Sequence, residues 1–458
     1  MSDLDQQLPP WPESALARTA LGIVRRLQEG GHEGWFVGGA VRDWLLGEPL
    51  EDIDIATSAQ PEVVQRLFPQ TRAVGAHFGV VLVMVDGHTH EVATFRAEGS
   101  YVDRRRPESV RYGTLEEDWP RRDFTINAMY YDPVARRLLD PAGGRGDIER
   151  RRLATVGNPR TRFGEDALRL MRAVRFAARY GFEIEPETAR AIKACAPHLK
   201  EISAERVADE LIRIMTGPNP GRAMRLMSDL GLWAQFIPEI EAMRGCEQPA
   251  NFHPEGDVFV HTALVLDSLR EAWPGEPPPE LALAALLHDV GKPPTFERGE
   301  DRIRFPEHQA VGAEMADAIG RRLKLSGRMR DEIRELVAHH MRFMDVRRMK
   351  RSTLRRLLGR CDFDLHLALH KADCLGSHNK LDSYEYCHRM RREIAEEDRE
   401  RALIPAPFLD GKDLIDAGLR PGPAFGDILH EAHELQLEGE LASRDEALAW
   451  LKRRAERI

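Results

Sequence analysis

The stretch Trp35-Phe36-Val37-Gly38-Gly39-Ala40-Val41-Arg42-Asp43 decides the fold of the first part of this chain. It begins with a short apolar run that is typical of a buried strand. Gly38 and Gly39 follow, and glycines let backbone amides approach an anion without side chains in the way. A helix that opens at about Ala40 would aim its first N–H groups at that anion. The stretch therefore predicts a phosphate site on a strand–turn–helix frame.

Two aspartates follow nine residues later in Glu51-Asp52-Ile53-Asp54-Ile55, which reads as a second strand. Alternation along a strand puts Asp52 and Asp54 on one face, roughly 6.6 Å apart at about 3.3 Å per residue. Such a pair suits Mg²⁺, which prefers oxygen ligands and bridges to substrate phosphates. Each motif alone is more often a plain turn or an exposed strand edge. Their order and closeness favour a metal-dependent phosphoryl-transfer enzyme.

The composition limits the class of protein. The 458 residues allow about two to four domains. We find neither a signal-peptide pattern nor an apolar stretch of about eighteen residues, so we expect a cytoplasmic protein without membrane contact. The five cysteines are widely spaced and form no CxxC motif, which argues against a disulfide framework or a zinc ribbon. The sequence does not indicate an oligomeric state.

Charge is unevenly distributed around a net value of −9. Residues 145–179 hold ten arginines against four acids, and residues 342–360 hold eight Lys/Arg against one acid. Each run alone is usually a solvated helix face. Beside a triphosphate site, the two runs favour a polyanionic second substrate.

The periodicity changes near residue 155, which predicts an α+β chain. Before it, β-like runs at 79–85 and 89–95 flank a hairpin turn at Asp86-Gly87, and 128–132 is another strand. After it, the spacing is helical and we see no strand pairs. The expected division has four parts: an α/β head at 20–150, then an all-helical neck and body at 151–249, a domain at 250–380 and a tail at 381–458.

Further polar residues of the head are candidates for the same site. Glu91 lies mid-strand and would add a third carboxylate if its strand neighbours that of the two aspartates. Residues 99–112 read as a long polar loop. The guanidinium of Arg122 would neutralise phosphate, whereas Asp123 and Asn127 would either hydrogen-bond a ribose or tie down the loop.

A helix that opens at Glu165 carries a candidate base-reading face. Asp166, Arg169 and Arg172 are spaced by three and share one side. A carboxylate that accepts from an exocyclic amine, beside a guanidinium that donates to ring acceptors, matches cytosine and adenine rather than uracil and guanine. The face predicts a choice of CTP and ATP. The alternative is an ordinary i,i+3 ion pair on a surface helix.

Four motifs together resemble the class II tRNA nucleotidyltransferases and bacterial poly(A) polymerases, over about residues 30–240. They are GGAVRD, the DxD pair, RRDFTINAM at 121–129 and GEDALRLMRAVRFAARYGF at 164–182. The resemblance implies an α/β nucleotidyltransferase head and three sets of contacts: magnesium at Asp52 and Asp54, the triphosphate at Gly39, Arg42 and Arg122, and the incoming base at Asp166, Arg169, Arg172 and Arg175.

The family includes enzymes that add CCA to tRNA, enzymes that add only CC or only A, and poly(A) polymerases. The intact loop after Phe95 and the lack of a GRRF-type segment near residues 75–85 favour CCA addition. An A-adding enzyme or a poly(A) polymerase is the alternative. The tRNA 3′-hydroxyl would attack the α-phosphorus of CTP or ATP, with magnesium lowering the pKa of that hydroxyl and Asp54 or Glu91 assisting its deprotonation.

A second constellation of histidines and aspartates lies downstream and resembles the HD phosphohydrolase superfamily. Imidazoles and carboxylates from several helices can bind a divalent transition metal. The expected ligands are His261, His288, Asp289 and Asp373, with His308 and one or both of His339 and His340 holding a second metal. Some tRNA nucleotidyltransferases carry this domain. An alternative function is that of an HD hydrolase whose head only binds RNA. The paired aspartates of the head argue against it, because a head that only binds RNA has no need of them.

Overall fold

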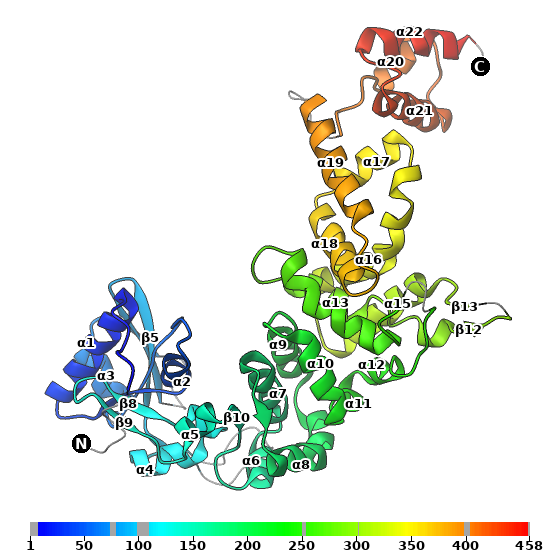
Figure 1. Cartoon of the computed structure of the whole chain (residues 1–458). Helices are drawn as coiled ribbons and strands as arrows, with labels where there is room; N and C mark the ends of the chain where they lie inside the picture. The colour runs from blue at the N-terminus through cyan, green and yellow to red at the C-terminus, as the bar shows by residue number, and fades with distance from the viewer. Residues whose placement is uncertain are drawn as a thin grey trace. The chain divides into compact units, whose positions relative to one another are not determined.

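The computed structural model describes residues 8–73, 79–98, 110–249, 253–300, 302–397 and 404–456. The chain divides into two compact units, of which the first comprises residues 1–241 with 322–325 and the second comprises residues 242–321 with 326–458. Figure 1 shows a sheet in the first unit and mainly helices in the second. The α+β class is confirmed.

A seven-stranded sheet in the order β3-β4-β5-β2-β1-β8-β9 is the frame of the head. Neighbours in it pair antiparallel, except that β2 and β5 run parallel. Its strands are β1 (Gly34–Val37), β2 (Asp54–Thr57), β3 (Thr71–Ala73), β4 (Val80–Val85), β5 (His88–Thr94), β8 (Tyr130–Asp132) and β9 (Arg137–Leu139). The head helices are α1 (Ala15–Glu29), α2 (Gly39–Leu46), α3 (Pro61–Leu67), α4 (Leu115–Asp118) and α5 (Gly144–Glu149).

The predicted hairpin is confirmed between β4 and β5. Asp86 and Gly87 form its turn with φ of 48° and 79°. Two consecutive residues with positive φ match the right-handed twist of the flanking strands, and Asp-Gly is a preferred pair for such a turn. A short pair, β6 (Arg96–Glu98) and β7 (Val110–Tyr112), lies beside it in sequence. The expected long loop at 99–112 falls mostly on residues 99–109, which lie outside the described residues.

Helices dominate the rest of the first unit. They are α6 (Pro159–Glu165), α7 (Leu168–Tyr180), α8 (Pro186–Cys195), α9 (Ala204–Met215), α10 (Pro220–Asp229), α11 (Trp233–Phe236) and α12 (Pro238–Ala242). One difference from the all-helical prediction is a parallel pair of two-residue strands, β10 (Arg152–Leu153) and β11 (Glu183–Ile184). Gly181 ends α7 in the left-handed conformation and turns the chain back toward β10.

The second unit packs its helices around apolar segments such as α14, whose residues 281–287 are all buried. Its helices are α13 (Val258–Ala272), α14 (Pro279–Leu287), α15 (His308–Arg322), α16 (Gly327–His339), η7 (His340–Arg348), α17 (Arg351–Leu358), α18 (Phe363–Leu375), α19 (Asp382–Glu397), α20 (Gly411–Asp416), α21 (Ala424–Glu438) and α22 (Arg444–Ala455). Here too the all-helical expectation misses a short hairpin, β12 (Glu297–Arg298) with β13 (Ile303–Arg304).

Candidate functional site

The glycine turn of the head lies between β1 and α2. Gly38 has φ 64°, a backbone conformation that side chains rarely adopt, and Gly39 is the first residue of α2. A Cβ on Gly38 would lie 3.4 Å from Nη1 of Arg122. The turn therefore places the start of α2 beside a guanidinium, an arrangement that suits a phosphate.

Three carboxylates influence one another electrostatically near the start of β2, which pairs with β1 just before this turn. Asp54 opens β2, whereas Asp52 precedes the strand and is exposed, which corrects our expectation that both lie within it. Glu91 lies on β5, the parallel neighbour of β2, one residue before the Ile55–Val92 pair. Burial and the charges of Asp52 and Glu91 raise the pKa of Asp54 to about 7, against the opposing charge of Arg122. This all-oxygen, mutually repelling donor set fits a hard divalent cation.

Arg42 belongs to a network that joins α2 to α7. It donates from Nη1 to Oδ1 of Asn127 at 2.6 Å and forms two 2.9 Å bonds to the carboxylate of Asp43. Its guanidinium lies over the rings of Phe176 and Tyr180 at 5.1 and 4.8 Å, and the Tyr180 hydroxyl donates to Asp43 at 2.8 Å. The residue expected to bind the triphosphate thus also fixes the helix that begins at the glycine turn.

Arg122 is held by a separate set of partners. Its Nε donates to the Tyr130 hydroxyl at 2.8 Å and its Nη2 to Oδ2 of Asp118 at 3.2 Å. Burial raises the pKa of Asp118, but Arg121 and Arg122 outweigh it and hold that pKa below its ordinary value. The carboxylate therefore stays ionised and keeps Arg122 oriented.

Asp123 and Asn127 serve as internal supports in this structure. Asp123 accepts from Arg172 at 2.6 and 2.9 Å, from Nδ2 of Asn127 at 3.0 Å and from the backbone N–H of Phe124 at 2.8 Å. Burial raises the pKa of Asp123, but Arg172 and Asn127 outweigh it and place the pKa well below the ordinary value. The sequence left two roles open for Asp123 and Asn127: to hydrogen-bond a ribose or to hold the loop in place. In the structure both side chains are hydrogen-bonded to neighbouring protein groups.

The candidate base-reading helix differs from the prediction at its start. Asp166 lies in a break between α6 and α7, with an extended backbone (φ −143°, ψ 106°), so the expected continuous helix from Glu165 is wrong. Asp166 pairs with Arg206 at 2.8 Å, while Arg169 pairs with Glu165 at 2.6 Å. The i,i+3 pair between Asp166 and Arg169 therefore does not form. The two share a helix face only if both are helical, and Asp166 is not.

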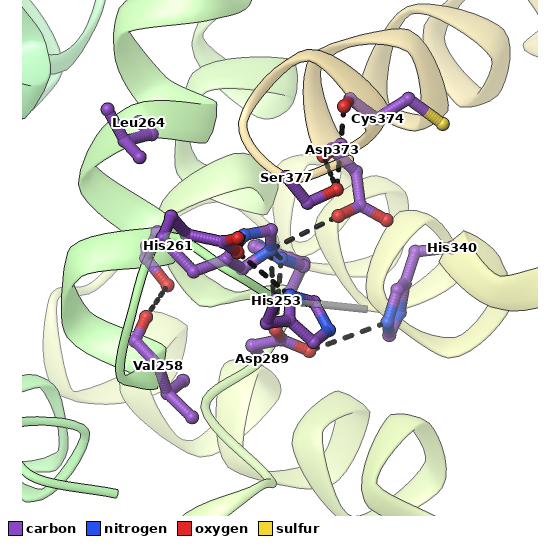
Figure 2. Close-up of polar contacts among 12 residues, drawn as sticks. His253, Val258, His261, Leu264, Asp289, His340, Asp373, Cys374 and Ser377 are labelled. Atoms are coloured by element: carbon purple, nitrogen blue, oxygen red, sulfur yellow. Dashed lines mark hydrogen bonds and ion pairs between the residues drawn. The ribbon is translucent and has the colours of Figure 1, made fainter. Parts of the chain in front are cut away.

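Six of the predicted residues in the second unit form a compact cluster. Two sets of ligand atoms lie within 4.8 Å: His261, His288 and Asp373 form one, and Asp289, His308 and His340 form the other. Oδ2 of Asp289 faces Nε2 of His288 at 3.3 Å and of His261 at 3.7 Å, and its Oδ1 faces Nε2 of His308 at 3.6 Å and of His340 at 3.7 Å. The Asp289 carboxylate thus faces imidazoles of both sets, and Figure 2 shows its contact with His340.

The histidine rings of this cluster are oriented by contacts at their Nδ1 atoms. The Nδ1 atoms of His288, His308 and His340 lie 2.7 to 3.1 Å from backbone carbonyls three residues earlier. Nδ1 of His261 lies 2.8 Å from Glu255. Each Nε2 is therefore directed toward Asp289 or Asp373, the arrangement that metal-binding histidines adopt. Figure 2 shows His261 directed at Asp373, 3.1 Å away.

His339 is the one predicted ligand that the structure does not bring into the cluster. Its side chain is 32% exposed and lies 3.5 Å from Glu335. Neighbouring residues at the end of a helix point in directions about 100° apart, so His340 and His339 cannot both face the same centre.

Three family models match the chain. They describe a Poly A polymerase head domain at 34–154, a probable RNA and SrmB-binding site of polymerase A at 181–244, and an HD domain at 258–375. A CCA-adding enzyme of Geobacillus kaustophilus (strain HTA426) is 50% identical over 224 residues, which cover 49% of this chain and 55% of that protein. The sequence match thus spans about half the length of this curated relative.

A solved structure extends the likeness over the whole chain. The Bacillus stearothermophilus CCA-adding enzyme in complex with CTP is 30% identical, with a TM-score of 0.71 and 97% of this chain and 98% of that chain covered. The chain belongs to the family of tRNA nucleotidyltransferases and poly(A) polymerases. The Thermotoga maritima CCA-adding enzyme complexed with tRNA shares its fold at 20% identity, with a TM-score of 0.61 and 98% and 97% coverage. Among the described residues, none of the helices is both long and apolar enough to span a bilayer.

Several residues of this family member were missed at the sequence level. In the first unit they are Asp118, Arg206 and Glu210, which hold Arg122, Asp166 and Arg175. In the second unit they are His253, Glu255 and Lys292. Lys292 lies three residues after Asp289 in the HDVGK stretch, and its Nζ lies 2.6 Å from Oδ2 of Asp289. This i,i+3 spacing could have predicted the ion pair from the sequence.

Acids from distant positions pair with several arginines of the two basic runs. In the second run Arg347 pairs with Asp382, Arg356 with Glu434, and Arg360 with Glu335. In the first run, Arg172 and Arg175 pair with Asp123 and Glu210. The polyanion-binding role of these runs stays a prediction.

Proposed function

We propose that this protein is a CCA-adding tRNA nucleotidyltransferase, which transfers CMP and AMP from CTP and ATP to the tRNA 3′ end. The observation that carries the proposal is the cluster of Asp52, Asp54 and Glu91 beside the glycine turn. The likeness to a CTP-bound CCA-adding enzyme over nearly the whole chain supports the choice of reaction. We also propose a cytoplasmic location, where tRNA, CTP and ATP are all present.

We assign roles to the residues of the head on this basis. Asp52 and Asp54 would hold magnesium, which when bound would neutralise triphosphate charge and lower the pKa of the attacking hydroxyl. The amides after Gly39 and the guanidinium of Arg122 would seat the phosphates. Asp54 or Glu91, whose charge raises the pKa of Asp54, would assist deprotonation of the attacking hydroxyl.

The base would be read at the start of α7. Asp166 would accept from the exocyclic amine of cytosine or adenine, and the guanidinium groups of Arg169, Arg172 and Arg175 would donate to ring acceptors. We also propose the four-part division at 20–150, 151–249, 250–380 and 381–458, of which the three family matches support the first three parts.

One assay tests the reaction against its alternatives. Labelled tRNA transcripts that end before CCA, after CC and after CCA are incubated with CTP, ATP or both. A CCA-adding enzyme completes the first two and stops on the third. An enzyme that extends only the CC transcript adds A alone, and one that adds many adenosines is a poly(A) polymerase.

A second activity is favoured by the placement of Asp289. Its two oxygens face different sets of imidazoles, so it is suited to bridge two metals in a phosphohydrolase centre. A cavity of about 380 Å³ adjoins the cluster and is lined by Lys292, Arg304, Phe305 and His378, among others, which suits a small phosphoester. Elemental analysis, and hydrolysis of 2′,3′-cyclic nucleotides with magnesium, manganese and nickel, test this proposal. A protein that holds no metal and hydrolyses nothing would contradict it.

A further inference from the structure

A buried histidine contacts the backbone between the two aspartates of the head. His90 precedes Glu91 on β5 and is 1% exposed. Its Nδ1 lies 3.2 Å from the carbonyl oxygen of Ile53, and its Nε2 lies 2.8 Å from Oγ1 of Thr19. A carbonyl oxygen can only accept, so Nδ1 carries a proton and donates to Ile53. The Thr19 hydroxyl can donate or accept, so it suits Nε2 in either form of the ring.

The carbonyl that His90 contacts belongs to the peptide group that joins Ile53 to Asp54. Asp52 lies on one side of Ile53 and Asp54 on the other. The pairing of β2 with β5 starts at Ile55, so the imidazole holds a carbonyl just beyond the end of this regular pairing. Because a peptide group is planar, fixing its carbonyl also fixes the backbone from which the Asp54 side chain departs.

The other side of the His90 ring is held by helix α1. Thr19 is 8% exposed, and its Oγ1 also lies 2.9 Å from the carbonyl oxygen of Leu16, three residues earlier in the helix. Helix α1 packs against β1, β2 and β5, and Ile23 and Leu27 are among its buried residues. His90 thus links the aspartate segment to a helix that is fixed against the sheet.

We infer that His90 is a positioning residue that holds Asp52 and Asp54 in the geometry for a divalent cation. The inference rests on the proposed function and adds to it a residue that is too buried to contact the substrates. Contacts behind the ligands of a metal orient them, and the loss of one such contact lowers metal affinity about 10- to 100-fold. Without His90, the peptide between the two aspartates can turn, and their like charges can move apart. Affinity for magnesium then falls, while the phosphate seat is unchanged.

The first test is the magnesium dependence of single-turnover CMP addition to a tRNA transcript lacking CCA. His90→Leu removes both ring nitrogens and keeps a similar volume, so it should raise the magnesium concentration for half-maximal rate roughly tenfold. Its rate at saturating magnesium should approach that of the wild type, because the carboxylates are still present. His90→Asn places an amide N–H as far from the backbone as Nδ1, so it should restore much of the wild-type magnesium dependence.

Equilibrium binding gives a second readout, without turnover. CTP is titrated into the full-length protein in a calorimeter with tRNA left out, once with magnesium and once with EDTA. In His90→Leu the gain in CTP affinity that magnesium provides should fall roughly tenfold. The affinity in EDTA should equal that of the wild type, since it depends on the contacts of the protein with the nucleotide alone.

His88→Leu is the matched control. His88 lies two residues earlier on the same face of β5, and its ring makes no hydrogen bond to another described residue. The magnesium dependence of this variant should equal that of the wild type.

Two results would overturn the inference and show that the role of His90 is structural. One is that His90→Leu lowers the rate by the same factor at every magnesium concentration, and the other is that His90→Asn is as impaired as His90→Leu. If the leucine variant does not fold, His90→Gln decides, because its amide lies beyond the position of Nδ1: a raised magnesium requirement supports the inference and a wild-type requirement overturns it. A wild type that adds no nucleotide to tRNA overturns the proposed function itself.

Discussion

Replacing Asp54 with asparagine should stop nucleotide addition and yet stabilise the protein when divalent cations are removed. Burial, Asp52 and Glu91 raise the pKa of Asp54 from 3.8 to about 7. The native state therefore binds a proton that the unfolded state releases across this window. Wild-type stability should fall as pH rises from about 4 to about 7, because the carboxylate must then ionise among two others.

The size of the effect follows from that shift. A difference of about 3 pKa units corresponds to about 4 kcal/mol at most, at about 1.36 kcal/mol per unit. Asp54 is only partly buried, so solvent screening should reduce this to about 2–4 kcal/mol. Asparagine keeps the shape and removes the charge. The variant should thus equal the wild type in stability below about pH 4 and exceed it above about pH 7.

Urea unfolding in EDTA at about pH 4 and pH 8 measures the stability, and single-turnover CMP addition with magnesium measures the reaction. Addition should fall on the order of 10³-fold or more, since a metal-binding oxygen is lost. Asp209→Asn, an exposed change on α9, should alter neither quantity. Near-normal addition by the Asp54 variant, or no gain in its stability at about pH 8 in EDTA, would refute the reasoning.

Three further predictions concern the supporting contacts and the second site. Asp123→Asn should lower the free energy of unfolding by about 1–3 kcal/mol in urea titrations, because Arg172 loses its partner. Because the pKa of Asp123 is lowered in the native state, this loss of stability should be present above about pH 4 and should vanish as the pH falls further. A loss of stability that does not depend on pH would contradict this prediction. The double substitution His288→Ala with Asp289→Ala should abolish bound transition metal in elemental analysis while CCA addition stays within about twofold, and a folded variant that loses addition would refute this independence. Burial lowers the pKa of His261, but its carboxylate partners Asp373 and Glu255 outweigh burial and raise the pKa to about 9. Metal binding must displace this proton, so the metal affinity measured by calorimetry should increase with pH up to about 9. An affinity that does not change with pH would count against His261 as a ligand.

The sequence by itself predicted the elements and residue types that lie close together along the chain. Local backbone preferences determine the glycine turn at Gly38-Gly39 and the hairpin turn at Asp86-Gly87. Both turns could therefore be predicted from the sequence. The family motifs likewise carry their own order and spacing.

Tertiary structure decided every relation between residues far apart in sequence. Asp166 meets Arg206 across 40 positions, and Asp123 meets Arg172 across 49. Whether Glu91 lies near the two aspartates depended on β5 being the neighbour of β2, which no local pattern reveals. The bridging position of Asp289 between two sets of imidazoles also arises only when helices from separate segments pack together. Spacing along the chain can place a side chain on a face, but only packing sets which other faces it meets.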